Sequence, residues 1–256
     1  MSSKNSRQQR AQERIAAMRA AEARRRRRRI WLIVTAAAVV VIGAAVGITL
    51  AVTGGSSGST NNGLPLASLS TLGNLQAAPA AGPAGPEGIP IPSGPALAGI
   101  TTAATGQTVD GISCQTAEQT VFHIHAHLTV FVNGSARQIP AAIGIPGAQA
   151  TQTAQGEFIE SGSCFYWLHT HAPDGIIHIE SPVQRSYTLG NFFDEWGQPL
   201  SSDQVGPVNG HVVAIYNGQV YTGNPRNIPL TAHAQIQLQV GTPLVAPEHV
   251  TNWGGL

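Results

Sequence analysis

The sequence contains little sulfur, few charges and few aromatic side chains. Charged residues make up 11% and aromatic residues 5% of its 256 residues. Its only methionines are Met1 and Met18, and its only cysteines are Cys114 and Cys164. A blue-copper centre, which needs a thiolate and usually a thioether, is therefore disfavoured. The final 150 residues contain neither a Gly-x-Ser-x-Gly element nor a phosphate-binding glycine motif, so serine-hydrolase and nucleotide chemistry have little support.

One long run, residues 30–53, contains no charged side chain at all. As a helix these residues would extend about 36 Å, enough to cross a bilayer. The run is longer than the apolar core of a cleaved signal peptide, so we expect an uncleaved transmembrane anchor. Six arginines at 24–29 precede it, and cationic flanks stay on the cytoplasmic side. The sequence thus predicts a single-pass cell-membrane protein with a cytoplasmic N-terminus and an extracytoplasmic C-terminal domain.

The basic residues are concentrated before this run. Residues 1–29 carry eleven cations against two acids, a net charge of +9, whereas the rest of the chain has three arginines against eleven acids. Such a segment is compatible with nucleic-acid binding, but the flank of an anchor and contact with anionic lipid account for it. We therefore expect a membrane partner and no nucleic-acid partner.

Residues 54–106 consist mainly of Gly, Ser, Ala, Pro, Asn and Thr, with Glu87 as the only charge. They lack sustained apolar periodicity, so we expect a disordered linker that buries no core. Residues 107–256 hold all nine histidines and both cysteines, and we expect them to form one extracytoplasmic domain. A Cys114–Cys164 disulfide is predicted, because two cysteines in an oxidising compartment usually pair.

Alternating apolar and polar residues predict strands throughout this domain. The clearest strand covers Phe122–Val132, with an apolar core face and three histidines on the opposite face, and it ends at the turn-forming pair Asn133-Gly134. Further strands are predicted at Cys164–His171, Gly175–Glu180, His211–Tyr216, Gln219–Tyr221 and Leu230–Val240. A short helix is predicted over Leu189–Trp196, capped by Thr188. The predicted fold class is mainly β, an antiparallel sandwich or barrel with one short helix.

Six histidines of these strands are the candidate metal ligands. Two imidazoles at positions i and i+2 of a strand can reach one ion while an adjacent strand supplies a third. The predicted ligands are His123, His125, His127, His169, His171 and His178. Because no thiol or thioether is available, this set suits Zn(II) or Cu(II). Glu180 and Asp174 are predicted as carboxylates that orient the ligating rings.

Another interpretation of the cluster is a polar sheet face that happens to use imidazole, or a surface that becomes charged below about pH 6.5. His211, His233 and His249 are isolated in the sequence, and we expect no metal role for them. Phe165 and Trp167, beside His169, are expected to pack rather than to bind a ligand.

Three blocks of the domain resemble a family of uncharacterised bacterial and archaeal exported proteins with a His-rich domain. They are HIHAHL at His123–Leu128, LHTH followed by DGIIHIESP within Leu168–Pro182, and YTLGNFFDEWG at Tyr187–Gly197. The resemblance covers about residues 110–245. It implies that the histidines form one site and implies no particular reaction. Ala172 follows LHTH where the resemblance leads us to expect an acidic residue.

The leading functional hypothesis is a membrane-anchored, extracytoplasmic domain that binds Zn(II) or Cu(II). One alternative is a metal-dependent hydrolase or lyase, in which Glu180 or Asp174 would accept a proton from water at an open metal position. Another is a cell-envelope module that binds a protein or a glycan, with incidental histidines. The sequence identifies no catalytic residue.

Overall fold

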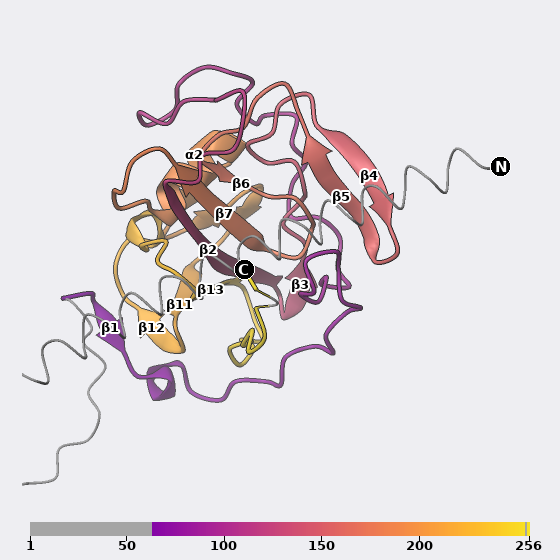
Figure 1. Cartoon of the computed structure of the whole chain (residues 1–256). Helices are drawn as coiled ribbons and strands as arrows, with labels where there is room; N and C mark the ends of the chain where they lie inside the picture. Colours follow the sequence, from indigo (N-terminus) through magenta and orange to yellow (C-terminus); the bar gives the residue numbers. More distant parts are fainter. Residues whose placement is uncertain (1–62, 254) are drawn as a thin grey trace, which may run out of the picture. The chain divides into compact units, whose positions relative to one another are not determined.

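A mixed eight-stranded sheet forms the centre of the fold (Figure 1). Its strands are β1 (Leu66–Ala67), β2 (Phe122–Val132), β3 (Ser135–Arg137), β6 (Leu168–His169), β7 (Ile176–Ser181), β11 (Val212–Tyr216), β12 (Gln219–Tyr221) and β13 (Ala234–Val240). Their order is β1-β12-β11-β13-β2-β7-β6, and β3 also pairs with β2. The prediction of a mainly β domain is confirmed.

The computed structural model describes residues 63–253 and 255–256. The predicted basic segment at 1–29 and membrane span at 30–53 lie outside these residues. Among the residues described, none belongs to a helix long and apolar enough to cross a membrane.

The sheet is not wholly antiparallel, because β13 and β2 run parallel while the other pairs are antiparallel. Nor does the described part of the chain close into a barrel, since β1 and β6 are the two ends of the strand order. The expectation of antiparallel pairing therefore holds for every pair of this sheet except β13 with β2, and the barrel, one of the two predicted alternatives, is not formed by the described residues. Parallel pairing needs a long crossover, and the chain between β2 and β13 supplies one. Alternation within a strand shows which of its faces is apolar, but it does not show which strand pairs with it.

Strand β2 has the bounds that the alternation predicted. Asn133 and Gly134 both have positive φ, 51° and 73°, as the turn into β3 requires. The apolar face of β2 lies in the core, as expected, but the histidine face is covered too. His125 and His127 are only 4% and 6% exposed. The three histidines share the face of β2 opposite its apolar face, as predicted. Both faces are buried, so the two faces do not differ in burial as expected.

The predicted strand at 164–171 is mostly irregular, and only β6 (Leu168–His169) pairs in the sheet. Its flanking residues bond instead to a neighbouring loop. The amide of Tyr166 donates to the carbonyl of Gly144, and that of Thr170 to Ile143. Gly144 has φ 72°, and a Cβ there would lie 2.2 Å from the Leu168 carbonyl oxygen, so this close approach requires glycine.

The predicted helix is confirmed as α2 (Leu189–Trp196). The Thr188 side chain accepts from the amide of Asn191, and the Asn191 side chain accepts from the amide of Thr188, which completes a capping box. The helix ends at Gly197 in the left-handed conformation. Its apolar stripe, which includes Phe192, Phe193 and Trp196, is buried in the main core.

Residues 64–106, expected to belong to a disordered linker, pack against the domain. Strand β1 pairs with β12, and η1 (Leu69–Leu72) follows it. Ile89 and Leu97 are 1% and 5% exposed. The composition of this segment does not allow it to build a core of its own. A few apolar side chains are nevertheless enough to cover a core that other strands have already built, so the expectation of disorder was wrong.

The smaller elements surround the main sheet. They are the hairpin β4 (Gln149–Thr153) and β5 (Gly156–Ser161), the three-stranded sheet β8 (Leu200–Ser201), β9 (Gln204–Val205) and β10 (Val208–Asn209), and η2 (Pro225–Asn227). The predicted disulfide between Cys114 and Cys164 is confirmed.

The polar face of β13 is covered by the end of the chain. Gln237 and Gln239 are buried. The side-chain oxygen of Gln239 accepts from the amide of Val245, and that of Gln237 accepts from the amide of Glu248. These polar residues therefore hold the C-terminal segment on the sheet.

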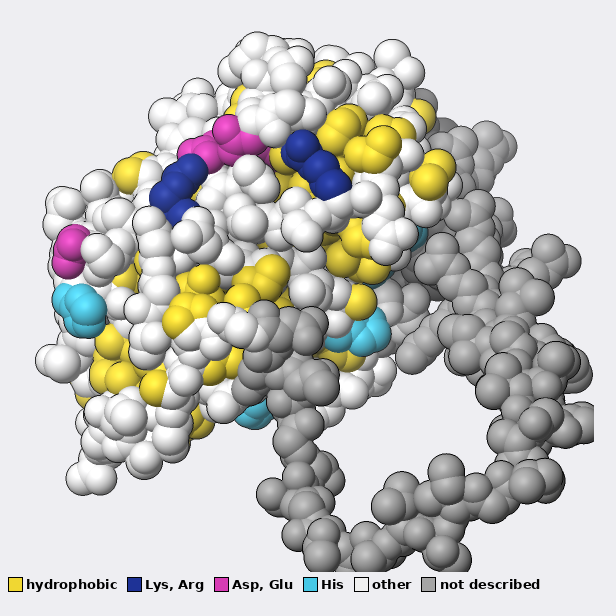
Figure 2. All heavy atoms as spheres, turned by 90° about the vertical axis from the view of Figure 1, so that its left-hand side faces the viewer, with side chains coloured by type: hydrophobic (Ala, Val, Ile, Leu, Met, Phe, Trp, Pro, Cys, Tyr) yellow, Lys and Arg dark blue, Asp and Glu magenta, His cyan; other side chains and the backbone are white. Residues whose placement is uncertain are grey.

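The described surface carries little charge. On the face in Figure 2, two cationic side chains lie beside an acidic patch, and another acidic side chain lies apart from them next to a histidine. The other histidine side chains on this face appear only in small separate spots. Among the described residues the cations are Arg137, Arg185 and Arg226, and Arg226 pairs with Asp194. Most of the predicted metal ligands are buried instead.

Candidate metal centre

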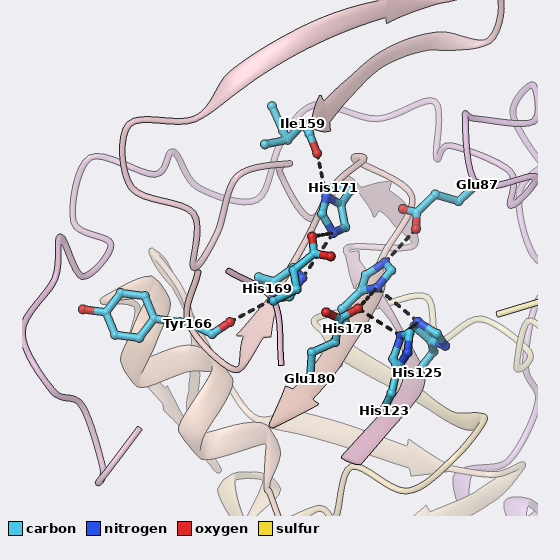
Figure 3. A network of polar contacts seen from close by, with 10 residues as sticks. Glu87, His123, His125, Ile159, Tyr166, His169, His171, His178 and Glu180 are labelled. Atoms are coloured by element: carbon cyan, nitrogen blue, oxygen red, sulfur yellow. Dashed lines mark hydrogen bonds and ion pairs between the residues drawn. The ribbon is translucent and has the colours of Figure 1, made fainter. Parts of the chain in front are cut away.

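Strand register brings histidines from three neighbouring strands into one row (Figure 3). His178 on β7 is paired with His125 on β2 and with His169 on β6. His123 is paired with Glu180. Directly opposed residues in neighbouring strands point to the same face, so these five side chains converge over the sheet.

Four donor atoms on β2 and β7 form a closed ring, called here the four-donor ring. His125 Nε2 lies 3.1 Å from both His123 Nε2 and His178 Nδ1. Glu180 Oε1 lies 2.9 Å from His123 Nε2 and 3.5 Å from His178 Nδ1. Two ligands that bind a tetrahedral zinc ion at 2.0 to 2.1 Å are about 3.3 Å apart. The ring therefore has the dimensions of a ligand set around one ion.

His169 and His171 form a second arrangement, called here the imidazole pair. Their Nε2 atoms lie 3.1 Å apart. His169 Nδ1 donates to the carbonyl of Tyr166 at 2.8 Å, and His171 Nδ1 donates to that of Ile159 at 2.6 Å. A metal-binding histidine typically donates its other ring nitrogen to a carbonyl or carboxylate in this way. Glu118 Oε1 lies 3.5 Å from His171 Nε2.

Glu87 is a member of the site that the sequence analysis missed, because it lies in the segment assigned to the linker. Its Oε1 accepts from His178 Nε2 at 2.7 Å, and the side chain is 4% exposed. The loop that carries it is closed by the amide of Ile91, which donates to the carbonyl of Pro83. Glu87 is the only charged residue in 54–106, and this isolation was the one feature of the sequence that could have indicated a role for it.

Glu118 was missed as well. It lies four residues after Cys114, and the disulfide joins Cys114 to the segment that leads into His169. Nothing in the local sequence distinguishes Glu118 from an ordinary surface carboxylate. Only the tertiary structure brings it to His171.

Of the two predicted carboxylates, Glu180 lies in the centre and Asp174 beside it. Asp174 Oδ1 accepts from the amide of Ile176 at 3.1 Å. Its main-chain carbonyl accepts from His127 Nε2 at 2.9 Å, so its side chain does not orient that ring. Burial and the nearby Glu87 raise the pKa of Asp174 well above its usual value.

His127 is not brought together with the other five predicted ligands. It belongs to none of the groups of close donor atoms among the described residues. It lines a separate cavity of about 480 Å³ with residues 78–82, 88–90, 92–93, 136 and 248–252. Burial lowers its pKa to about 4, although its bond to the carbonyl of Asp174 opposes the shift. His211, His233 and His249 also lie outside these donor groups, and His233 stacks on Trp253.

The imidazoles of the centre have opposite pKa shifts. Burial and the neighbouring His178 lower the pKa of His125 well below its usual value. Burial lowers the pKa of His169 to about 4, and that of His171 falls well below its usual value for the same reason. Burial also acts to lower the pKa of His178, but the carboxylates of Glu87 and Glu180 outweigh it and raise the pKa well above normal.

Several buried carboxylate oxygens remain without a hydrogen-bond partner among the residues described. Both oxygens of Glu195 are among them and lie outside the donor groups. In and beside the centre they are Oε2 of Glu87, Oε2 of Glu180 and Oδ2 of Asp174. A buried oxygen without a donor costs folding free energy, which a cation beside it would offset. Together with the close donor groups, these atoms make a buried His/Glu cluster that could hold a metal ion.

Comparison with protein-family models, with curated proteins and with solved structures finds no match.

Proposed function

We propose that this chain binds a transition-metal ion, Zn(II) or Cu(II), in the four-donor ring of His123, His125, His178 and Glu180. The observation that carries the proposal is the closed ring of four donor atoms with edges between 2.9 and 3.5 Å. Three imidazole nitrogens and one carboxylate oxygen are ligands that both ions accept.

The composition of the ring favours holding an ion over catalysis. Zinc in a structural site has four protein ligands, whereas a catalytic site keeps one position for water. The ring can supply four ligands. Glu87 at His178 Nε2 supports the same role, because a carboxylate on the second nitrogen fixes the ring and makes it a stronger ligand.

The proposal competes with a protonated network. In that alternative, an imidazolium of His178 donates to Glu87 and Glu180, and protons hold the cluster together without metal. The two can be separated because only metal binding makes the stability depend on metal concentration. An ion at a hundred times its dissociation constant would raise the unfolding free energy by about 2.7 kcal/mol.

The test is metal analysis and thermal unfolding of the purified full-length chain with Zn(II) and, separately, Cu(II). We expect bound metal and a rise in Tm. His125→Gln should reduce both effects, because His125 Nε2 touches two other donors of the ring. The matched control is His211→Gln, which changes an exposed imidazole and should retain them. A chain that binds neither ion and shows no rise in Tm would refute the proposal.

We also propose that residues 30–53 anchor the chain in the cell membrane, with the domain outside the cytoplasm. The Cys114–Cys164 disulfide supports this location, because such bonds persist mainly in oxidising compartments. Protease added to spheroplasts should degrade the domain and spare an N-terminal tag. Protection of the domain would contradict the proposed orientation.

A further inference from the structure

We infer that a second metal ion binds at the imidazole pair, so that the centre is binuclear. This inference rests on the proposed function, because the second ion would share the Glu180 carboxylate with the ion in the four-donor ring. Its own support comes from different residues, His169, His171 and Glu118.

The hydrogen bonds of the imidazole pair fix the positions of its protons. A carbonyl oxygen can only accept, so Nδ1 of both rings must carry the proton that it donates to Tyr166 or Ile159. In a neutral ring the other nitrogen, Nε2, then bears a lone pair. The two lone pairs meet at 3.1 Å, which is unfavourable unless a cation lies between them.

The imidazole pair has a further donor close by. Glu118 Oε1, 3.5 Å from His171 Nε2, supplies a third ligand from a partly exposed side chain. Ligands on opposite sides of one zinc ion are at most about 4.2 Å apart. Among the described residues, no group of donors within 4.8 Å of one another combines the imidazole pair with His123 and His125. One ion therefore cannot bind both sets.

One side chain can bind on both sides. His178 lies close to both sets, but its Nδ1 belongs to the four-donor ring and its Nε2 donates to Glu87, so it supplies no ligand to the second ion. Glu180 belongs to the four-donor ring and also to a group with Glu118 and His169. Its Oε1 lies in the ring, whereas its buried Oε2 has no hydrogen-bond partner among the described residues. A carboxylate placed in this way can bridge two ions about 3.5 to 4 Å apart.

The charges agree with two ions. Glu87, Glu118 and Glu180 each contact an imidazole of the centre, and Glu87 and Glu180 are buried. One divalent ion beside three carboxylates leaves a net charge of −1, and two divalent ions leave +1. The charge balance is therefore as small with two ions as with one, and uncompensated charge is costly inside a protein.

The test counts ions in the full-length chain. After loading with zinc and removal of free metal, we expect two zinc ions per chain. The double variant His169→Gln, His171→Gln should retain one, as should Glu118→Gln if zinc is kept near the dissociation constant of the second ion. The control His211→Gln should retain two.

The outcomes separate the inference from the proposed function. One zinc in the unmodified chain, unchanged in the double variant and lost in His125→Gln, would overturn the second ion and leave the function intact. No zinc in the unmodified chain would overturn both.

A measurement on the unmodified chain does not depend on whether a variant folds. Two Cu(II) ions about 4 Å apart should couple magnetically. The electron paramagnetic resonance signal of the unmodified, Cu(II)-loaded chain should then integrate to well below the copper content. A signal equal to the copper content at one ion per chain would overturn the inference.

Discussion

The four-donor ring and the imidazole pair are built from similar side chains but differ in what holds the rings. In the imidazole pair, each Nδ1 is fixed by a main-chain carbonyl, which cannot donate in return. In the ring, His178 lies between two carboxylates. A carbonyl leaves a neutral ring with a lone pair ready for metal, whereas paired carboxylates also stabilise the protonated ring. The ring can therefore exist with protons or with metal, while the imidazole pair is suited to metal.

Removing the shared carboxylate should have the largest effect. Glu180→Gln takes the charge from His123 and His178 in a buried site, and loss of one buried partner costs about 3 to 5 kcal/mol. We expect a lower unfolding free energy in denaturant titrations and loss of zinc from the four-donor ring. Glu248→Gln, in the C-terminal segment and outside the donor groups, is the control. Wild-type zinc content in Glu180→Gln would show that the ring is not the ligand set.

The disulfide should affect the two sets unequally. Cys114→Ser with Cys164→Ser opens a loop of about 50 residues and should lower the unfolding free energy by about 4 kcal/mol. Because Cys114 precedes Glu118 and Cys164 precedes His169, zinc at the imidazole pair should weaken more than zinc in the ring. Calorimetric titration of the oxidised and the variant chain measures this. Equal weakening at both sets would contradict the division into two sets.

Acid should destabilise the metal-free chain. His127 and His169 have folded pKa values of about 4 and an ordinary value of 6.5. The unfolded state therefore binds more protons between these pH values, and stability that is present above pH 6.5 is lost as the pH falls toward 4. Each histidine accounts for up to about 3 kcal/mol.

Urea titrations at pH 7 and pH 5 measure this loss. His178 has the opposite effect on the pH dependence of stability. Its raised pKa favours folding at low pH, and this contribution is lost as the pH rises through its pKa in the folded state. His127→Gln should reduce the loss between pH 7 and pH 5 without changing zinc content, because His127 lies outside both sets. A changed zinc content would make His127 a ligand after all.

The smallest expected effect separates stability from metal binding. Thr188→Ala removes the capping box of α2 and should lower the unfolding free energy by about 1 kcal/mol. Helix α2 supplies no donor to either set, so zinc content should not change. Thr188→Ser, which can still cap the helix, is the matched control. A loss of zinc in Thr188→Ala alone would show that the sets respond to any loss of stability.

Several elements could be predicted because their causes are local. The alternation and the Asn133-Gly134 turn defined β2, and Thr188 with the apolar stripe defined α2. The strand at 164–171 could not be predicted in this way, since its backbone bonds go to Ile143 and Gly144, far away in the chain.

The sequence by itself determined which residue types were available and which side of each strand they occupy. Strand periodicity placed His123, His125 and His127 on one face of their strand, and His169 and His171 on one face of theirs. The shortage of sulfur restricted the site to imidazole and carboxylate donors.

Only the tertiary structure decided which of these side chains meet. Pairing β7 between β2 and β6 placed His178 between His125 and His169 and left His127 beyond the end of the row, against the carbonyl of Asp174. It also buried Glu87 beside His178. The physical reason is that the face on which a side chain lies depends on neighbouring residues in one strand. Strand order and loop packing depend instead on burial of the whole chain.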